Sequence, residues 1–186
     1  MNRTKNAIIQ AFWQLLEEKP YNKITVKDIV DSCQINRNTF YYHFHDIPEL
    51  LEDTIKQDAD NIIQTHHNFD SPIDCLTVLA QHCIAHQKAI LHIYRSVQRE
   101  IFLNELNRIC LYTVTQYINA ITANLTISPD DKKLLIRFYK CALVGVLLDW
   151  MNEGMSYDPI ASFSRISDLL ACSGKQTFLK ATIPNE

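Results

Sequence analysis

Apolar residues recur along this chain at intervals of three and four positions, the spacing that lines one face of an α-helix. In the first such segment, about residues 3–18, Ile8, Phe12 and Leu16 share a face, and Pro20 ends the helix. No segment shows the strict alternation of a half-buried strand. The chain is therefore expected to be an all-α protein. The same pattern predicts eight more helices, at about 26–33, 37–43, 46–67, 72–87, 89–96, 98–125, 129–153 and 159–173.

Two short helices near the N-terminus are predicted to form a helix-turn-helix. Thr25 and Asn36 are suited to cap them, because their side-chain oxygens can accept hydrogen bonds from the first turn. Ile29 in the first helix and Phe40 and Phe44 in the second can close a small core. The second helix is then left protruding, and such a helix fits the major groove of DNA.

The protruding helix and the start of its supporting helix carry side chains that hydrogen-bond bases or phosphates. Arginine can grip guanine with two hydrogen bonds and asparagine can do so with adenine, whereas Thr, Tyr and His more often reach phosphates. The alternative is a polar, aromatic surface helix, although two adjacent exposed tyrosines beside Arg and Asn are unusual on a surface without a partner. The predicted DNA-binding residues are Thr25, Lys27, Asn36, Arg37, Asn38, Thr39, Tyr41, Tyr42 and His43.

The charge distribution favours the N-terminal part as the DNA-facing side. The chain carries 18 Lys and Arg and 21 Asp and Glu, a net charge of −3. Residues 1–45 hold six of the basic residues and four of the acidic ones, so they are net positive and the remainder is net negative. This asymmetry would orient the molecule on double-stranded DNA.

The cysteines and the apolar runs indicate the cellular compartment. Six cysteines are scattered without a CxxC motif, which is typical of free thiols in a reducing cytoplasm. The N-terminus lacks the apolar segment of a signal peptide, and the longest apolar run, 141–148, is too short to span a membrane. We therefore expect a cytoplasmic protein with no membrane contact, associated with the nucleoid when bound to DNA.

Residues from about 5 to 51 resemble the DNA-binding domain of the TetR/AcrR family. The matching pieces are the amphipathic first helix, the segment ITVKDIV, and NTFYYHF followed by a short break and ELL. The resemblance implies nine helices, of which three form a helix-turn-helix DNA-binding domain at 1–46, with a linker helix from 46. Residues 47–186 would form the effector-binding and dimerisation domain. Two positions depart from the family pattern: Gln34 replaces a small turn residue, and Ile47 replaces a lysine that would contact phosphate.

The segment CALVGVLLDWMNEG, followed by Asp158 and Pro159, resembles regulators associated with dihydroxyacetone kinase operons. Residues 141–148 are apolar on nearly all sides, so their helix needs cover on more than one face. Its own domain can cover one face and a second copy the other, in a two-fold four-helix bundle. The alternative is an internal helix in a monomer. The predicted dimer-interface residues are Leu143, Leu147, Trp150, Phe163, Ile166 and Leu170.

An effector pocket is expected among the helices between about 72 and 150. For each candidate polar residue, the alternative to ligand contact is that the side chain packs in the core or lies exposed on the surface. His82 and His86 have a metal-compatible i, i+4 spacing but no third ligand beside them, and no cysteine is marked as a redox sensor, so no metal or cofactor is predicted. The candidate effector residues are His86, Tyr94, Asn107, Tyr112, Tyr117 and Tyr139.

Together these features predict a ligand-responsive repressor that acts as a homodimer on a palindromic operator. The competing hypothesis is a regulator whose C-terminal domain binds a protein partner in place of an unknown small-molecule effector. An enzyme is not expected, because the chain has no Ser/His/Asp order, no glycine-rich phosphate loop and no metal signature.

Overall fold

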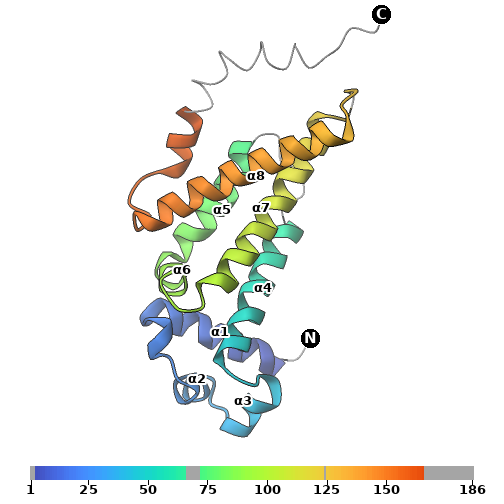
Figure 1. The fold of residues 1–186 in the computed structure, drawn as a ribbon. Helices are drawn as coiled ribbons and strands as arrows, with labels where there is room; N and C mark the ends of the chain where they lie inside the picture. Colours follow the sequence, from blue (N-terminus) through green and yellow to red (C-terminus); the bar gives the residue numbers. More distant parts are fainter. Residues whose placement is uncertain (1–2, 66–71, 124, 166–186) are drawn as a thin grey trace, which may run out of the picture. The chain divides into compact units, whose positions relative to one another are not determined.

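The computed structural model describes residues 3–65, 72–123 and 125–165, and the regular structure in these ranges is helical (Figure 1). The expected all-α fold is confirmed. Residues 159–165 begin the last predicted helix, and the rest of it lies outside the described residues. The helices are α1 (Arg3–Glu18), the 3₁₀ helix η1 (Tyr21–Lys23), α2 (Val26–Cys33), α3 (Arg37–His43), α4 (Ile47–Thr65), α5 (Pro72–Ala85), α6 (Gln87–Tyr94), α7 (Arg99–Ile121) and α8 (Pro129–Asn152).

Several bounds differ from the expected ones. The helix α6 runs over Gln87–Tyr94 and not over 89–96, and α5 ends at Ala85 and not near residue 87. The short η1 follows Pro20 and was not expected. The helix α7 ends at Ile121 and not near residue 125, because Leu125 N–H donates to the Thr122 carbonyl in a turn. Among the described residues, no helix has both the length and the apolar character needed to cross a membrane.

The described residues divide into two compact units. Unit 1 comprises residues 3–65 and 82–109, and unit 2 comprises 72–81 together with the described residues from 110 to 165. The helices α5 and α7 contribute residues to both units. The predicted boundary between residues 46 and 47 separates a DNA-binding function from effector binding and dimerisation, and it stays a prediction.

Unit 1 is built around α1. This helix packs against α2, α4 and α6, and Ile8, Phe12 and Leu16 on its apolar face are fully buried. The Phe12 ring also meets Tyr21 of η1 edge to face, with ring centroids 6.5 Å apart. Since burying each large apolar side chain contributes roughly 1.5–3 kcal/mol, the three core residues of α1 are a major source of stability in this unit.

Unit 2 has its core along α8, where Leu147 and Trp150 are buried. The Trp150 indole N–H donates to the Tyr157 carbonyl over 2.8 Å, which ties the chain after the helix back onto it. The helix ends as expected at Gly154, whose φ of 69° a glycine adopts without strain. The Met155 N–H then donates to the Trp150 carbonyl over 2.8 Å and closes the turn.

The turn between α2 and α3 depends on a non-glycine residue in the left-handed conformation. Gln34 has φ 56° and ψ 40°, and its N–H donates to the carbonyls of Asp31 and Val30. The Ile35 N–H also donates to the Val30 carbonyl, over 3.0 Å. This geometry explains why a small residue is common here: a β-carbon in the left-handed region is strained.

We expect Gln34→Gly to stabilise the protein by about 0.5–1 kcal/mol, because glycine removes the strain of the left-handed position. Glycine also raises the conformational entropy of the unfolded chain, but this opposing effect is smaller than the strain removed. Urea unfolding followed by circular dichroism measures the difference. Gln34→Ala is the control: it keeps a β-carbon and should not stabilise. Equal stabilisation by both variants would show that the backbone conformation is not the cause.

Candidate nucleic-acid interface

The helix α3 is anchored from one side by two aromatic residues. Phe40 and Phe44 are buried, with ring centroids 6.0 Å apart. At the start of the helix, the Asn36 side-chain oxygen accepts from the Thr39 N–H over 2.8 Å and from the Thr39 hydroxyl over 3.0 Å. These contacts hold a seven-residue helix that is too short to be stable alone.

The supporting helix α2 is held by a charged capping box. The Asp28 carboxylate accepts from the Thr25 N–H over 2.8 Å and from the Thr25 hydroxyl over 2.7 Å. Lys19 Nζ lies 2.9 Å from the same carboxylate oxygen. The hydrogen bond from Lys19 and then those from Thr25 lower the pKa of Asp28 to about 2. The carboxylate is therefore charged at neutral pH, where it compensates the positive end of α2.

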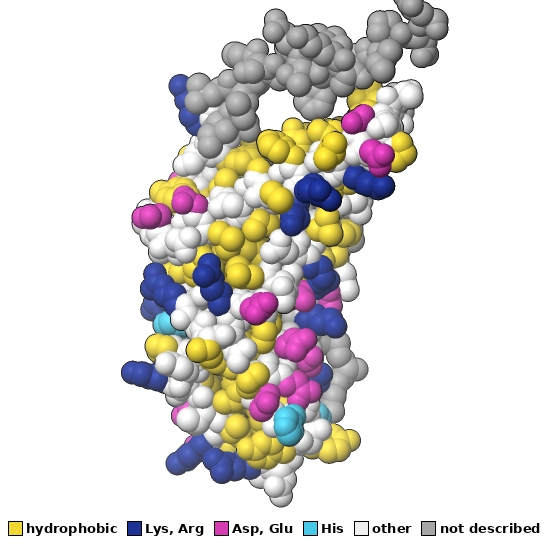
Figure 2. Space-filling model, in the orientation of Figure 1, with side chains coloured by type: hydrophobic (Ala, Val, Ile, Leu, Met, Phe, Trp, Pro, Cys, Tyr) yellow, Lys and Arg dark blue, Asp and Glu magenta, His cyan; other side chains and the backbone are white. Residues whose placement is uncertain are grey.

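All nine predicted DNA-binding residues lie at the start of α2, at the cap of α3 or on α3 itself. Seven of them are exposed and only Thr39 and His43 are half-buried. The two tyrosines are exposed to 54% (Tyr41) and 82% (Tyr42), well above the usual exposure of large aromatic side chains. Figure 2 shows Lys and Arg side chains gathered over the end of unit 1 where α2 and α3 lie in Figure 1.

The nine residues fall into two groups by their contacts. Thr25, Asn36 and Thr39 spend their side-chain oxygens on helix caps, so they shape the helices. By contrast, the side chains of Arg37 and Asn38 make no hydrogen bond or ion pair to the part of the chain that the structure describes, and both are exposed. The first turn of α3 therefore presents free hydrogen-bonding groups on a rigid base.

Three of the six candidate effector residues lie in unit 1, where each has a partner. His86 Nδ1 faces the Trp13 indole N–H at 3.0 Å and lies 3.2 Å from Glu17 Oε1. Tyr94 is buried, and its hydroxyl bonds to the Arg99 guanidinium over 2.5 Å. Asn107 donates to the Leu103 carbonyl over 2.9 Å. Each of these three polar groups is therefore already hydrogen-bonded within its own unit.

The other three candidates, Tyr112, Tyr117 and Tyr139, lie in unit 2 and are half-buried. Tyr117 on α7 and Tyr139 on α8 meet edge to face, with ring centroids 6.3 Å apart. Burial raises the pKa of the Tyr117 hydroxyl, with smaller contributions from Tyr139 and Cys75. The hydroxyl therefore stays protonated at neutral pH and is able to donate a hydrogen bond.

The histidines and cysteines are the side chains to consider as metal ligands and redox sensors. His82 Nε2 is buried and lies 2.6 Å from Asp58 Oδ2, but not in hydrogen-bonding geometry. Within the described ranges no three His, Cys, Asp or Glu residues are arranged to hold a metal ion. Burial raises the pKa of the Cys75 thiol to about 11 and that of Cys83 to about 12. These two thiols are protonated at neutral pH, which disfavours a role in sensing oxidants.

Leu143, Leu147 and Trp150, expected at a dimer interface, are buried within unit 2 itself. Their side chains are thus already covered, and their interface role stays a prediction. Phe163 is half-buried, and both Ile166 and Leu170 lie outside the described residues.

A different face of α8, which was not expected from the sequence, is exposed and apolar. Leu134 is 59% exposed and Phe138 is 66% exposed, and Cys141 and Gly145 are also exposed. These four residues, the α8 stripe, follow at i, i+4, i+7 and i+11, so they share one face of the helix. Figure 2 shows hydrophobic side chains along α8 on the face turned to the viewer. The spacing was readable in the sequence, but which of the two apolar faces is covered was not.

Two family models match the chain. Residues 8–54 match the model described as bacterial regulatory proteins, tetR family, and residues 70–171 match a transcriptional regulator C-terminal region. The HTH-type transcriptional regulator YxbF of Bacillus subtilis (strain 168), described as uncharacterized, is 27% identical over 164 residues, which are 84% of this chain and 42% of that protein. The dhaKLM operon transcriptional activator DhaS of Lactococcus lactis is 32% identical over 66 residues, 36% of this chain and 35% of that protein. The chain thus matches less than half the length of either relative.

Solved structures share the fold over almost the whole chain. The dihydroxyacetone kinase operon activator DhaS has a TM-score of 0.74 at 21% identity, covering 92% of this chain and 96% of its own. The fatty acid degradation regulator FadR from Bacillus halodurans has a TM-score of 0.65 at 18% identity, covering 91% and 95%. Salmonella enterica GusR has a TM-score of 0.62 at 21% identity, covering 91% and 96%. At these identities the likeness establishes the arrangement of helices and no ligand or target.

The contribution of the α3 N-cap to the free energy of unfolding should be measurable. We expect Asn36→Ala to destabilise the protein by about 1 kcal/mol, because it removes the acceptor of the Thr39 N–H at the start of the helix. Asn38→Ala, at an exposed position without a bonded partner in the described structure, should change stability by less than about 0.5 kcal/mol. Denaturant unfolding of the two variants side by side checks this, and equal losses would contradict the capping role.

Proposed function

Because the chain belongs to the tetR family of bacterial regulatory proteins, and is a transcriptional regulator that binds DNA and not an enzyme, we propose that it is a ligand-responsive repressor acting as a homodimer on a palindromic operator. The observation that carries this proposal is the first turn of α3, where hydrogen-bonding side chains stand exposed on a capped and buried base. The backbone that carries these groups is already ordered, so only their side chains lose freedom when they meet a base edge.

We assign recognition of the DNA sequence to Arg37 and Asn38, the first two residues of α3, which are both exposed. An arginine at the start of a recognition helix can bond both acceptors of a guanine, and an asparagine can do the same with adenine. Lys27, at the start of α2, is exposed and is assigned to a phosphate. The tyrosines Tyr41 and Tyr42 extend the same surface and are assigned to phosphate contacts that set the position on the duplex.

The homodimer is supported by the α8 stripe. A single short helix reads too few base pairs for useful specificity, whereas two copies one helical turn apart read a palindrome. Gly145 lies in the interior of a 24-residue helix, where glycine costs about 1 kcal/mol relative to alanine. No atom of the described residues lies within 4 Å of where its β-carbon would be, so that part of the chain does not require a glycine here. Close approach of a second copy would require one.

Effector binding is assigned to unit 2, where Tyr117 and Tyr139 offer hydroxyl groups beside an apolar core. An effector that binds the DNA-incompetent dimer more tightly would release the operator by shifting the population. The related DhaS is described as an activator, so the opposite output is the second candidate. Expression of a reporter fused to the chain's own upstream region distinguishes them: deletion of the regulator raises expression under repression and lowers it under activation.

The assigned roles of Arg37 and Lys27 predict different losses of DNA affinity. Arg37→Ala should cost about 1–3 kcal/mol and relax the preference at one base pair, because a guanine contact is lost. Lys27→Ala should weaken all sequences alike and reduce the salt dependence of binding by about one phosphate contact. Fluorescence anisotropy with operator and random duplexes, at several salt concentrations, measures both. Uniform loss with both variants would refute the division of roles.

The α8 stripe predicts the oligomeric state. Phe138→Glu should convert the dimer to a monomer, because it places a charge in an apolar interface. Asn119→Glu, which adds the same charge at an exposed position of α7, should leave a dimer. Light scattering after size-exclusion chromatography gives the mass of each variant. A Phe138→Glu protein that remains folded and dimeric would exclude the stripe as the interface.

A further inference from the structure

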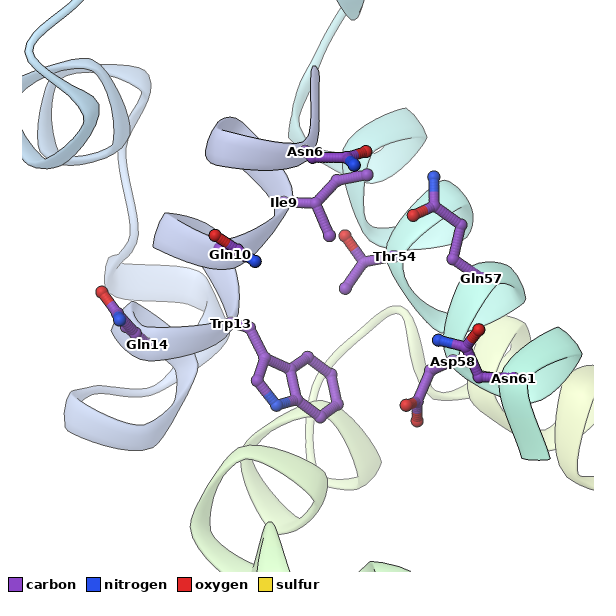
Figure 3. A pocket seen from close by; sticks show the side chains of 9 residues that line it. All are labelled: Asn6, Ile9, Gln10, Trp13, Gln14, Thr54, Gln57, Asp58 and Asn61. Carbon is purple, nitrogen blue, oxygen red and sulfur yellow. The ribbon is translucent and has the colours of Figure 1, made fainter. Parts of the chain in front are cut away.

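An open groove of about 600 Å³ lies between α1 and α4 within unit 1 (Figure 3). Its volume falls within the range of small-molecule sites, roughly 300–1,000 Å³. The proposed DNA contacts and the proposed effector site do not use it. We propose that this groove binds a neutral, hydroxyl-rich small molecule, a sugar or polyol, at a site separate from the effector site of unit 2.

Side-chain amides dominate the groove. In Figure 3 Ile9 and Trp13 of α1 and Thr54 of α4 point into the space between the two helices, whereas Gln14 points away from α4. An amide offers both a donor and an acceptor, which matches a hydroxyl group, itself both donor and acceptor. Within the described ranges none of these amides bonds to another protein group, so each is available to a ligand. The amides are Asn6, Gln10 and Gln14 from α1 and Gln57 and Asn61 from α4.

An aromatic ring and an aliphatic side chain supply the apolar part of the groove. Trp13 and Ile9 both line it and are half-buried. The Trp13 indole N–H points to His86 Nδ1 at 3.0 Å, and the two rings meet edge to face with centroids 5.2 Å apart. The indole is thus held in one orientation with its polar atom already satisfied. What remains for a ligand is apolar ring surface, which suits the C–H face of a sugar ring.

The charges around the groove select a neutral ligand. None of the nine lining residues is Lys or Arg, so an anion has no counter-charge. The one carboxylate among them is Asp58, and its Oδ2 lies 2.6 Å from the buried His82 Nε2 without forming a hydrogen bond to it. A cation at this oxygen would have to share the space with the histidine ring. Hydroxyl groups need no counter-charge and bury at little cost once they are hydrogen-bonded.

The test uses the fluorescence of Trp13, which lines the groove, to report ligand binding. The purified full chain is titrated with D-glucose, maltose and sorbitol as neutral probes and with inorganic phosphate and putrescine as charged probes. Emission is read at each step and heat is measured by calorimetry. Trp150 is 1% exposed and serves as a background that the probes do not reach. We expect a saturable change with at least one neutral probe and none with the charged probes.

Two matched variants of α4 locate the binding. Gln57→Leu removes a groove amide, and Gln64→Leu makes the same change at an exposed position that does not line the groove. We expect Gln57→Leu to weaken binding about tenfold or more, the loss of one good hydrogen bond, and Gln64→Leu to leave it unchanged. Thermal unfolding confirms that both variants are folded.

Three results would overturn the proposal. One is the lack of saturation by any neutral probe with a dissociation constant below about 10 mM, which corresponds to almost no specific contact. Another is saturable binding of phosphate or putrescine in place of the neutral probes. The third is equal affinity of the Gln57→Leu and Gln64→Leu proteins, which would place the ligand elsewhere. Because none of these readouts involves DNA, they are independent of the proposed operator function.

Discussion

The burial of one face of α1 is the interaction on which unit 1 depends. Ile8, Phe12 and Leu16 on this face are fully buried, and the same helix packs on α2, α4 and α6. The short helices α2 and α3 have too few residues to be stable alone, so the packing of α1 is needed to hold them in position. The face of α1 beside this stripe, which carries Trp13, borders the groove with α4. One face of α1 therefore supports the DNA-binding helices, and the adjacent face of the same helix lines the groove.

Local chemistry explains why much of the fold was predictable. Caps such as Thr25 and Asn36 act through hydrogen bonds to residues three positions away, so the sequence alone locates them. Gly154 likewise marks the end of α8, because only its own backbone conformation is at stake. The fold class and the starts of α2 and α3 followed from such signals. The start of α6 did not: its N-cap residue His86 makes no side-chain cap hydrogen bond, and the helix begins two residues before its expected start. The unexpected η1 is a single turn after a proline, too short to show a period.

Long-range features were not predictable in the same way. The segment 141–148 is apolar on nearly every side, and only the packing of unit 2 shows that Leu143 and Leu147 are covered while Cys141 is exposed. For the six candidate effector residues, the sequence indicated polar groups on apolar faces but not their partners. The structure satisfies Tyr94 within unit 1 and pairs Tyr117 with Tyr139 in unit 2. Partner identity is a property of the tertiary fold, which no spacing rule encodes.

The position of His86 has a consequence for the hydrogen-bond network that surrounds α1. Its Nδ1 faces both a donor, the Trp13 indole, and an acceptor, the Glu17 carboxylate. A bare nitrogen accepts from the indole and repels the carboxylate, whereas a nitrogen that carries a proton donates to the carboxylate and releases the indole. Nδ1 can therefore serve only one of these two groups at a time. The residue that separates α5 from α6 in the chain therefore contacts two side chains of α1, and one of them, Trp13, lines the groove.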